Sequence, residues 1–266
     1  MPTLGIIAGG GSFPATVALT AKERGYNVIG IGFLSDTDSS FPSHCDAFSW
    51  LRLGQLGKML SFLKRHHVDE VVMAGPINKP RALDLRPDWR AARLLLNLHT
   101  KGDDILLRAV TTEIEREGMK VVAPHHFTPG LLTPSGVLTQ RPPTERELSD
   151  MLLGWHISAQ IGQFDIGQCL VIRAGIVLAV EAIEGTNAAI ERGGSLGGPG
   201  AIVIKRRKPN QDARLDLPAA GLQTLQTMHT VGASCLVLES HASLFFDKST
   251  ALEFANRHNI CVLGHS

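Results

Sequence analysis

The stretch Thr3-Leu-Gly-Ile-Ile-Ala-Gly-Gly-Gly-Ser-Phe-Pro14 decides how the chain begins to fold. Its first residues are mostly apolar and predict a buried strand over residues 3–8, and the three glycines then predict a tight turn. Ser12 and Pro14 are typical of the cap and first turn of a helix, which we expect over residues 14–24. A strand, a glycine turn and a helix in succession open a βαβ unit.

The same alternation continues outward from this stretch. Apolar strand patterns recur at residues 28–33 and 70–74, with a helical pattern at 56–64 between them. Strands that alternate with helices indicate a mainly parallel, Rossmann-like sheet. The remaining elements expected in this part are helices at 88–98 and 103–117 and a buried strand at 120–123.

A segment rich in proline and glycine, residues 128–144, interrupts this pattern. Its prolines prevent a helix or a central strand from running through it. We therefore predict an α/β protein of two domains. They are an N-terminal Rossmann-like domain at 1–127 and a C-terminal mixed α/β domain at 145–266, joined by a linker at 128–144.

The C-terminal domain is expected to open with a helix that Thr144 caps and that Glu147 completes as a capping box. Two β-rich runs at 169–172 and 176–183 flank Arg173-Ala-Gly175, which predicts a hairpin. Antiparallel pairing here would contrast with the first domain. Further strands are expected at 201–205, 234–238 and 260–263, and helices at 221–230 and 250–257.

Composition excludes several classes of protein. The 266 residues carry 26 basic and 25 acidic side chains, so no net field attracts a nucleic-acid backbone. The four cysteines show neither a Cys-x-x-Cys pair nor zinc-site spacing, which indicates reduced thiols. We expect no signal peptide, because a basic n-region and an apolar h-region do not open the sequence, and no apolar run in it reaches membrane-spanning length. We expect a soluble, cytoplasmic protein, with peripheral contact to the membrane left open.

The glycine turn leaves two interpretations open. The backbone N–H groups of Gly9, Gly10 and Gly11 could hold a phosphate together with the following helix N-terminus. Alternatively, the glycines only provide the backbone freedom that a tight turn needs. A dinucleotide fingerprint is not met, because Pro14 stands where a third glycine is needed and Asp36 is a weak ribose ligand. A nucleotide with one sugar fits better than NAD.

Asn78 and Lys79 follow the strand at 70–74. Ligands of open α/β sheets bind at the carboxyl ends of the strands, so both residues are candidate ligand contacts. Asp103 and Asp104, in contrast, are explained most simply as carboxylates at the N-terminus of the next helix.

Charged residues gather in the middle of the second domain. Prolines discourage a helix from Lys208 to Pro218, so an extended chain is expected there. One interpretation is a solvated strand edge with a surface ion pair, and the other is a reactive site. The extended chain would place Asp212, Arg214 and Asp216 on one face and Leu215 and Leu217 on the other.

A second group of charges lies earlier in this domain. Glu181 and Glu184 end an apolar strand, and Thr186 is suited to cap a short helix through Ile190. Magnesium needs only one or two protein carboxylates, so Glu184 with Asp216 could hold Mg²⁺. The run Lys205-Arg-Arg-Lys208 is either a solvated strand end or an electrostatic clamp on a diphosphate.

Other motifs argue mainly by exclusion. No His-Glu-x-x-His pattern occurs, which disfavours a zinc protease. The stretch Ser195-Leu-Gly-Gly-Pro-Gly200 is expected to be a flexible glycine loop that covers a site or connects two strands.

Taken together, the motifs resemble the UDP-2,3-diacylglucosamine pyrophosphatases of the LpxI type, which act in the lipid A biosynthesis of Gram-negative bacteria. They follow one another in order across nearly the whole chain, so the resemblance is specific although no single motif is. The motifs are Gly5-Ile-Ile-Ala-Gly-Gly-Gly11, Ala74-Gly75 through Lys79-Pro80, Gly102-Asp-Asp-Ile-Leu-Leu-Arg108, Asp165-Ile-Gly-Gln168, Leu178-Ala-Val-Glu-Ala-Ile-Glu-Gly-Thr186, and Lys208-Pro-x-Gln-Asp through Asp216-Leu-Pro218.

The resemblance implies a two-domain α/β hydrolase with its site in the cleft between the domains. Water would attack the α-phosphorus of the UDP group with Mg²⁺ required, releasing UMP and 2,3-diacylglucosamine 1-phosphate, known as lipid X. The essential aspartate of the family maps to Asp216, with Asp212 as the second choice. A homodimer is also implied. Asn187 departs from the family pattern, which has an aspartate after the Gly-Thr pair.

The candidate site residues follow from both lines of reasoning. The candidate catalytic residues are Asp216 and Asp212, and the candidate metal ligands are Asp216 and Glu184. The candidates for substrate binding are Gly9, Gly10, Gly11, Asn78, Lys79, Thr186, Lys208, Gln211 and Arg214.

The sequence leaves two other functions open. A dehydrogenase or methyltransferase would use the glycine turn for its cofactor, although Pro14 counts against this. A non-catalytic protein that binds a sugar nucleotide or a lipid would need the same charged residues without turnover.

Overall fold

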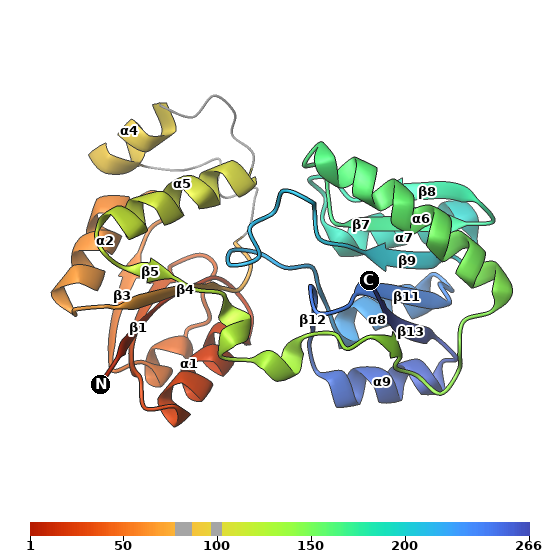
Figure 1. Ribbon diagram of the computed structural model, residues 1–266, viewed down its shortest axis with the longest axis horizontal. Helices are drawn as coiled ribbons and strands as arrows, with labels where there is room; N and C mark the ends of the chain where they lie inside the picture. The colour runs from red at the N-terminus through yellow and green to blue at the C-terminus, as the bar shows by residue number, and fades with distance from the viewer. Residues whose placement is uncertain (78–86, 97–102) are drawn as a thin grey trace. The chain divides into compact units, whose positions relative to one another are not determined.

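The computed structural model describes residues 1–77, 87–96 and 103–266, and these form two compact units (Figure 1). The first unit comprises Met1–Pro129 together with Asp212–Leu215. The second comprises Gly130–Gln211 and Asp216–Ser266. The expectation of a two-domain α/β protein is confirmed, and the units divide at residue 129 rather than across a separate linker.

The first unit is built on one fully parallel sheet with the strand order β3-β2-β1-β4-β5. Its central strands are buried along nearly their whole length, which explains why they read as continuous apolar runs. The parallel sheet predicted from the alternating pattern is confirmed. The strands are β1 (Thr3–Ala8), β2 (Asn27–Phe33), β3 (Ala47–Leu51), β4 (Glu70–Ala74) and β5 (Lys120–Val121).

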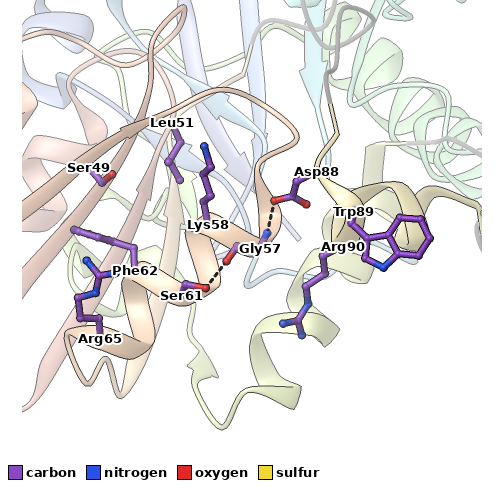
Figure 2. Close-up of a pocket in the computed structure, with 10 residues that line it drawn as sticks. All are labelled: Ser49, Leu51, Gly57, Lys58, Ser61, Phe62, Arg65, Asp88, Trp89 and Arg90. Carbon is purple, nitrogen blue, oxygen red and sulfur yellow. Dashed lines mark hydrogen bonds between the residues drawn. The ribbon is translucent and has the colours of Figure 1, made fainter.

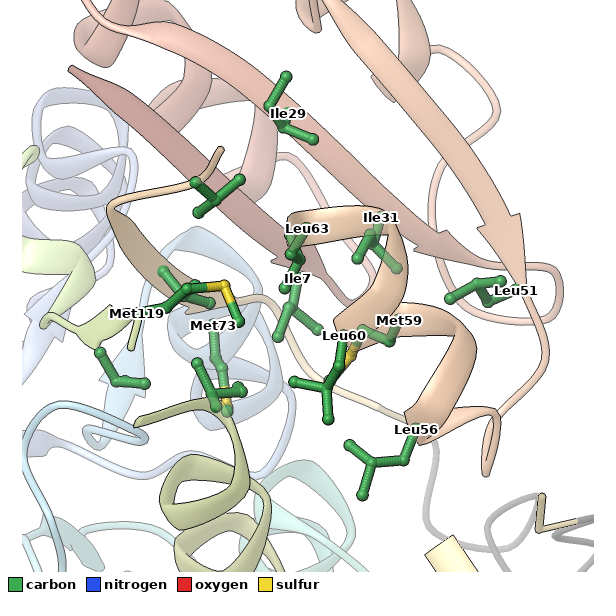
Figure 3. Close-up of a cluster of buried hydrophobic side chains, with 14 of the residues drawn as sticks. Ile7, Ile29, Ile31, Leu51, Leu56, Met59, Leu60, Leu63, Met73 and Met119 are labelled. Atoms are coloured by element: carbon green, nitrogen blue, oxygen red, sulfur yellow. The ribbon is translucent and has the colours of Figure 1, made fainter. Parts of the chain in front are cut away.

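Helices connect these strands. Proline lies in the first turn of α1, as its fixed φ favours. Apolar residues of α2, including Leu60 and Leu63, pack against Ile31 of the sheet in one buried cluster (Figure 3). The elements are α1 (Phe13–Glu23), η1 (Phe41–His44), α2 (Leu56–Arg65), α4 (Trp89–Leu96), α5 (Asp103–Arg116) and η2 (Pro124–His126).

The main sheet of the second unit is mixed, with the order β6-β13-β11-β9-β7-β8. The three strands β9, β11 and β13 are parallel, whereas β7 runs antiparallel to β9 and pairs with β8 in the predicted hairpin. A separate short pair joins β10 to β12. The strands are β6 (Gly136–Val137), β7 (Cys169–Arg173), β8 (Ile176–Val180), β9 (Ile202–Lys205), β10 (Ala219–Ala220), β11 (Cys235–Glu239), β12 (Leu244–Phe245) and β13 (Cys261–His265).

The strands of this sheet contribute side chains to two separate hydrophobic cores, because successive side chains point to opposite faces. Leu170 and Ile172 pack with Met151 and Trp155 of α6 on one face. Val171 packs with α7, α8 and α9 on the other. The sheet is therefore covered on both faces by α6 (Glu145–Gln163), α7 (Thr186–Gly197), α8 (Leu222–Thr230) and α9 (Lys248–Arg257).

Helix α6 begins where the sequence indicates. The Thr144 hydroxyl accepts the backbone N–H of Glu147, and the Glu147 carboxylate accepts the backbone N–H of Thr144. This reciprocal pair satisfies two N–H groups that a helix N-terminus leaves without partners. The predicted capping box is confirmed.

Two predictions about helix α7 are wrong. It does not end at Ile190, and Ser195 to Gly197 belong to it rather than to a flexible loop. The reason is packing, since a Cβ at Gly193 would lie 2.7 Å from Cβ of Val171. Glycine here allows the helix to lie close to the sheet, a contact between distant segments that local sequence does not reveal.

The segment predicted as a linker has structure of its own. Residues 130–144 belong to the second unit, where β6 pairs with the edge of β13. The Thr139 hydroxyl accepts the backbone N–H of Val262, and η3 (Pro129–Leu131) lies at the unit boundary. Prolines confine the segment to an edge position, as expected, but hydrogen bonds hold it there.

In the described ranges, none of the helices has the length and apolar character needed to span a bilayer.

Candidate active site

One edge of the second unit's sheet gathers polar side chains. The parallel strands β9, β11 and β13 end at Lys205, Glu239 and His265, and Gln168 precedes the antiparallel strand β7 at the same edge. Carboxyl ends of parallel strands are where ligands of α/β sheets bind. Asp216 lies beside this edge, where it accepts a hydrogen bond from Gln168.

Two glutamine amides hold the Asp216 carboxylate. Nε2 of Gln168 and Nε2 of Gln211 each donate to Oδ2 at 2.6 Å. In the described parts of the chain Oδ1 has no hydrogen-bond partner. One carboxylate oxygen is thus fixed by neutral donors while the other is available to a ligand.

The surroundings of Asp216 shift the pKa of its carboxyl group upward. Burial raises the pKa of this carboxyl group, while the hydrogen bond from Gln168 and the charge of Lys208 oppose the rise. The residue keeps exposed surface even though protein surrounds its carboxylate closely. Because this surface contacts water, solvent screens part of the burial effect and moderates the rise in pKa.

Two lysines add positive charge near Asp216. Lys205 is buried, and its Nζ donates to Oγ1 of Thr186 at 2.9 Å and to the carbonyl oxygen of Ala219 at 2.6 Å. Lys208 pairs through Nζ with Asp165. Both cations lower the pKa of Asp216 through their charge.

Glu181 links this group to the start of α7. Its Oε1 accepts the Thr186 hydroxyl at 3.0 Å and its Oε2 accepts the backbone N–H of Gln168 at 3.3 Å. Thr186 therefore joins Glu181 to Lys205. It is the first residue of α7, after Gly185 at the N-cap, rather than the predicted cap. Asn187 follows it in the first helical turn.

The basic run is not a solvated strand end. Lys205 is buried, and the guanidinium of Arg206 lies over Trp155, 4.5 Å from the ring centroid. Nη1 of Arg206 also donates to the Trp155 carbonyl oxygen at 2.7 Å. Arg207 is fixed through its backbone N–H, which donates to Oε2 of Glu239 at 2.7 Å. The strand end is therefore an ordered part of the sheet edge.

The prediction that Asp212 and Arg214 share one face of an extended chain with Asp216 is wrong. The backbone N–H of Leu215 donates to the Asp212 carbonyl oxygen at 2.9 Å, which closes a turn. Both residues belong to the first unit. Leu215 and Leu217 are buried as predicted.

In the first unit, Arg214 is occupied by two carboxylates. Its guanidinium pairs with Asp212 at 2.8 Å and with Glu115 at 2.7 Å. The hydrogen bond from Arg214 outweighs burial and lowers the pKa of Asp212. A carboxylate with a lowered pKa is a weak proton acceptor, so this pair is better suited to a structural role than to proton transfer.

Mg²⁺ fits Asp216 better than Glu184. Glu184 already pairs with Arg192 at 2.5 Å and accepts the backbone N–H of Ala182 at 3.1 Å. Within the described ranges, no three histidine, cysteine or acidic side chains form a cluster that could hold a metal ion. Magnesium nevertheless accepts one carboxylate when water and substrate phosphates fill its other positions. The free Oδ1 of Asp216 suits such a substrate-completed site.

The glycine turn in the first unit is already hydrogen-bonded. The backbone N–H of Gly9 donates to the Ala74 carbonyl oxygen at 2.8 Å and that of Gly10 to the Pro76 carbonyl oxygen at 2.7 Å. A Cβ at Gly9 would lie 2.3 Å from the carbonyl oxygen of Gly75, so glycine is required for this close approach. The tight-turn interpretation explains Gly9 and Gly10, and Gly11, with φ of 77°, remains a predicted phosphate contact.

The other predicted contacts divide into two groups. Asn78 and Lys79 lie outside the described residues. Thr186, Lys208 and Gln211 join Asp216 in one hydrogen-bonded and charged group of the second unit. The cleft between the domains stays a prediction.

Sequence reasoning missed three residues at this edge of the sheet. Gln168 was noted only as part of a motif, while Glu239 and His265 were not singled out. His265 stacks edge-on against Trp155, with ring centroids 4.8 Å apart. The ends of the predicted parallel strands were the available signal, because the carboxyl-end rule applies to the second sheet as well as to the first.

Comparison with known proteins gives matches over both units. The model of the LpxI N-terminal domain matches residues 3–131 and that of the LpxI C-terminal domain matches residues 134–263. A curated relative from Caulobacter vibrioides, UDP-2,3-diacylglucosamine pyrophosphatase LpxI, is 32% identical over 277 residues, which is 99% of this chain and 98% of the relative.

Solved structures resemble the chain only weakly. CobK precorrin-6A reductase is 10% identical over 98% of this chain and 86% of its own, with a TM-score of 0.35. N5-carboxyaminoimidazole ribonucleotide synthetase from Thermotoga maritima is 14% identical over 70% and 43%, with a TM-score of 0.30. Similarities of this size carry no argument about function.

Proposed function

Because the chain belongs to the LpxI family, we propose that it hydrolyses the diphosphate of UDP-2,3-diacylglucosamine in lipid A biosynthesis. Water attacks the α-phosphorus, and the products are UMP and 2,3-diacylglucosamine 1-phosphate. The observation that carries the proposal is the Asp216 carboxylate, which two glutamines hold beside two lysines at one edge of the sheet.

Asp216 is the residue to which we assign the central role. Its raised pKa makes it a better proton acceptor than an ordinary aspartate, which suits the activation of water. The hydrogen bonds from Gln168 and Gln211 fix Oδ2, so Oδ1 is directed to the water or to a cation. A base held in one orientation avoids an ordering cost during reaction.

Positive charge is the second requirement. A diphosphate ester gains negative charge as water attacks, and cations fixed in a partly buried site stabilise that charge. Lys205 and Lys208 supply it, with Lys205 held by Thr186 and Lys208 by Asp165. The pairing of Lys208 with a partly exposed carboxylate leaves it able to exchange Asp165 for a phosphate oxygen.

Mg²⁺ completes the proposed site. Asp216 would hold it through Oδ1, and Glu184 would join only after releasing Arg192. When bound, the ion polarises the phosphoryl oxygens and neutralises part of their charge. Whether Asp216 acts as the base or as the ligand of the cation, the amides of Gln168 and Gln211 hold its carboxylate in one orientation.

The proposal includes the place in the cell where the reaction occurs. The substrate carries two acyl chains, so we place the protein in the cytoplasm with peripheral contact to the inner membrane. We also propose a homodimer, which a measurement of mass in solution would test.

The experiment compares purified wild type with Asp216→Ala for release of UMP from the substrate with and without Mg²⁺. We expect release by the wild type only with Mg²⁺, and a loss of about 10²–10⁴-fold in the variant. Asp212→Ala serves as the matched control and should keep most of the activity. Equal activity in wild type and Asp216→Ala would overturn the role of Asp216, and no release by either would favour a binding protein.

A further inference from the structure

Helix α4 presents an apolar and basic face to solvent. Trp89 and Leu96 are 83% and 85% exposed, and Arg93 between them is also exposed. These positions are spaced i, i+4 and i+7, so their side chains share one side of the helix. A single exposed apolar side chain is common, but exposed apolar side chains that share a helix side with a cation form a patch of the kind that marks an interaction surface.

The inner side of α4 is anchored to the first unit. Ala91 is buried, and the Asp88 carboxylate accepts the backbone N–H groups of Gly57 at 2.7 Å and Ala91 at 3.0 Å. Arg90 pairs with Glu113 at 2.9 Å and with Glu117 at 2.6 Å. The outward direction of Trp89 is therefore set by the packing of the helix.

A groove of about 540 Å³ lies between α2 and α4 (Figure 2). Leu51 and Phe62 give it an apolar lining, and Lys58 and Arg65 line it from α2. The two cations are seven residues apart and so lie on the same side of α2. Trp89 lines the same groove, which joins the two helices into one surface.

Positive charge exceeds negative charge on this surface, where Asp88 is the acidic residue among those that line the groove. Arg90, Lys64 and Arg116 are paired with Glu113 and Glu117. In contrast, no acidic partner is found for Lys58, Arg65 or Arg93 among the residues that the structure describes. The α2/α4 face, defined as Lys58, Arg65, Trp89, Arg93 and Leu96, thus combines three unpaired cations with two exposed apolar side chains.

We propose that the α2/α4 face docks on the surface of an anionic lipid bilayer. Tryptophan is enriched at the boundary between headgroups and acyl chains, and leucine enters the apolar layer below it. The three cations complement the negative charge of the headgroups. This inference rests on exposed residues of the first unit and stands whether or not the proposed hydrolysis is confirmed.

The test is co-sedimentation of the full chain with vesicles that contain no sugar nucleotide. We expect binding to vesicles of phosphatidylcholine with phosphatidylglycerol, little binding to phosphatidylcholine alone, and a loss of binding as salt rises. Arg93→Glu, Trp89→Ala and Leu96→Ala should each weaken the partition coefficient by about tenfold.

Matched controls come from the second unit. Arg146→Glu and Leu196→Ala change an exposed arginine and a leucine that is 69% exposed, and they should leave binding unchanged. Circular dichroism confirms that each variant is folded. UMP release from detergent-dispersed substrate is measured separately, so a failure of docking and a failure of the hydrolysis are distinguished.

Three outcomes would overturn the proposal. The wild type could fail to sediment with either kind of vesicle, or the control variants could weaken binding as much as the α2/α4 variants do. A change of oligomeric state in Trp89→Ala, without vesicle binding by the wild type, would instead assign the face to a second copy of the chain.

Discussion

Glu147 and Asp216 are carboxylates of the same unit held in opposite ways. Arg141 donates to both carboxylate oxygens of Glu147, at 2.8 and 3.0 Å, and Ser234 donates at 2.6 Å. Burial would raise the pKa of Glu147, but these hydrogen bonds prevail and lower it to about 2. For Asp216 burial prevails, because its hydrogen bonds come from neutral amides.

The difference separates a structural carboxylate from a reactive one. A guanidinium fixes Glu147 in its charged form, and the pair in turn fixes the start of α6 to β11 through Ser234. Glutamine amides fix the orientation of Asp216 without supplying a full charge. Its ability to take up a proton or bind a cation is therefore retained.

The largest expected effect is on stability. Glu147→Gln leaves the partly buried Arg141 without its charge partner, and we expect the free energy of unfolding to fall by about 3 kcal/mol. Denaturant titration measures this. Glu145→Gln, in the same helical turn, is the control and should change the free energy of unfolding little.

Asp216→Asn should be neutral or slightly stabilising at neutral pH, because a raised carboxyl pKa makes ionisation unfavourable to the folded state. Similar losses in all three variants would contradict the comparison.

The pH dependence should also separate the two residues. At a pH above 4.5, the ordinary pKa of a glutamate, the lowered pKa of Glu147 stabilises the fold. This contribution is lost as the pH falls toward about 2. The excess stability of the wild type over Glu147→Gln should shrink in that window. For Asp216 as a base, the acid limb of kcat/KM should have its midpoint above 3.8. A midpoint below 3.8 would indicate instead that Asp216 binds the cation.

The smallest effect concerns the two glutamines. Each removed amide takes one hydrogen bond from Asp216, so Gln168→Ala and Gln211→Ala should each lower kcat/KM by about 2–12-fold. Gln163→Ala, at the end of α6, is the matched control. Wild-type activity in both test variants would show that the orientation of Asp216 does not depend on these amides.

Much of the fold could be predicted from local patterns. The strands of the first unit are continuous apolar runs because both faces of their sheet are covered, and Thr144 with Glu147 is a local capping signal. Helix α7 was misread because Gly193 is explained by contact with Val171, which lies on another element. The turn at Asp212 was missed because prolines nearby favoured an extended chain.

The candidate site was predicted only in part. Asp216, Gln211 and Lys208 lie close together in sequence, and family resemblance also pointed to them. Gln168 lies 48 residues before Asp216, and only the tertiary fold brings the two together. The burial of Lys205 could not be predicted from a basic run, since its partners Thr186 and Ala219 come from other segments.

The placement of Leu215 limits how the protein can be divided. Residues 212–215 belong to the first unit although the chain before and after them belongs to the second, and Leu215 is part of the first unit's buried cluster. A fragment cut after residue 129 would therefore lack a side chain of its own core and leave a cavity there. A single cut therefore does not separate the two units. An exchange of the first unit between relatives must include residues 212–215.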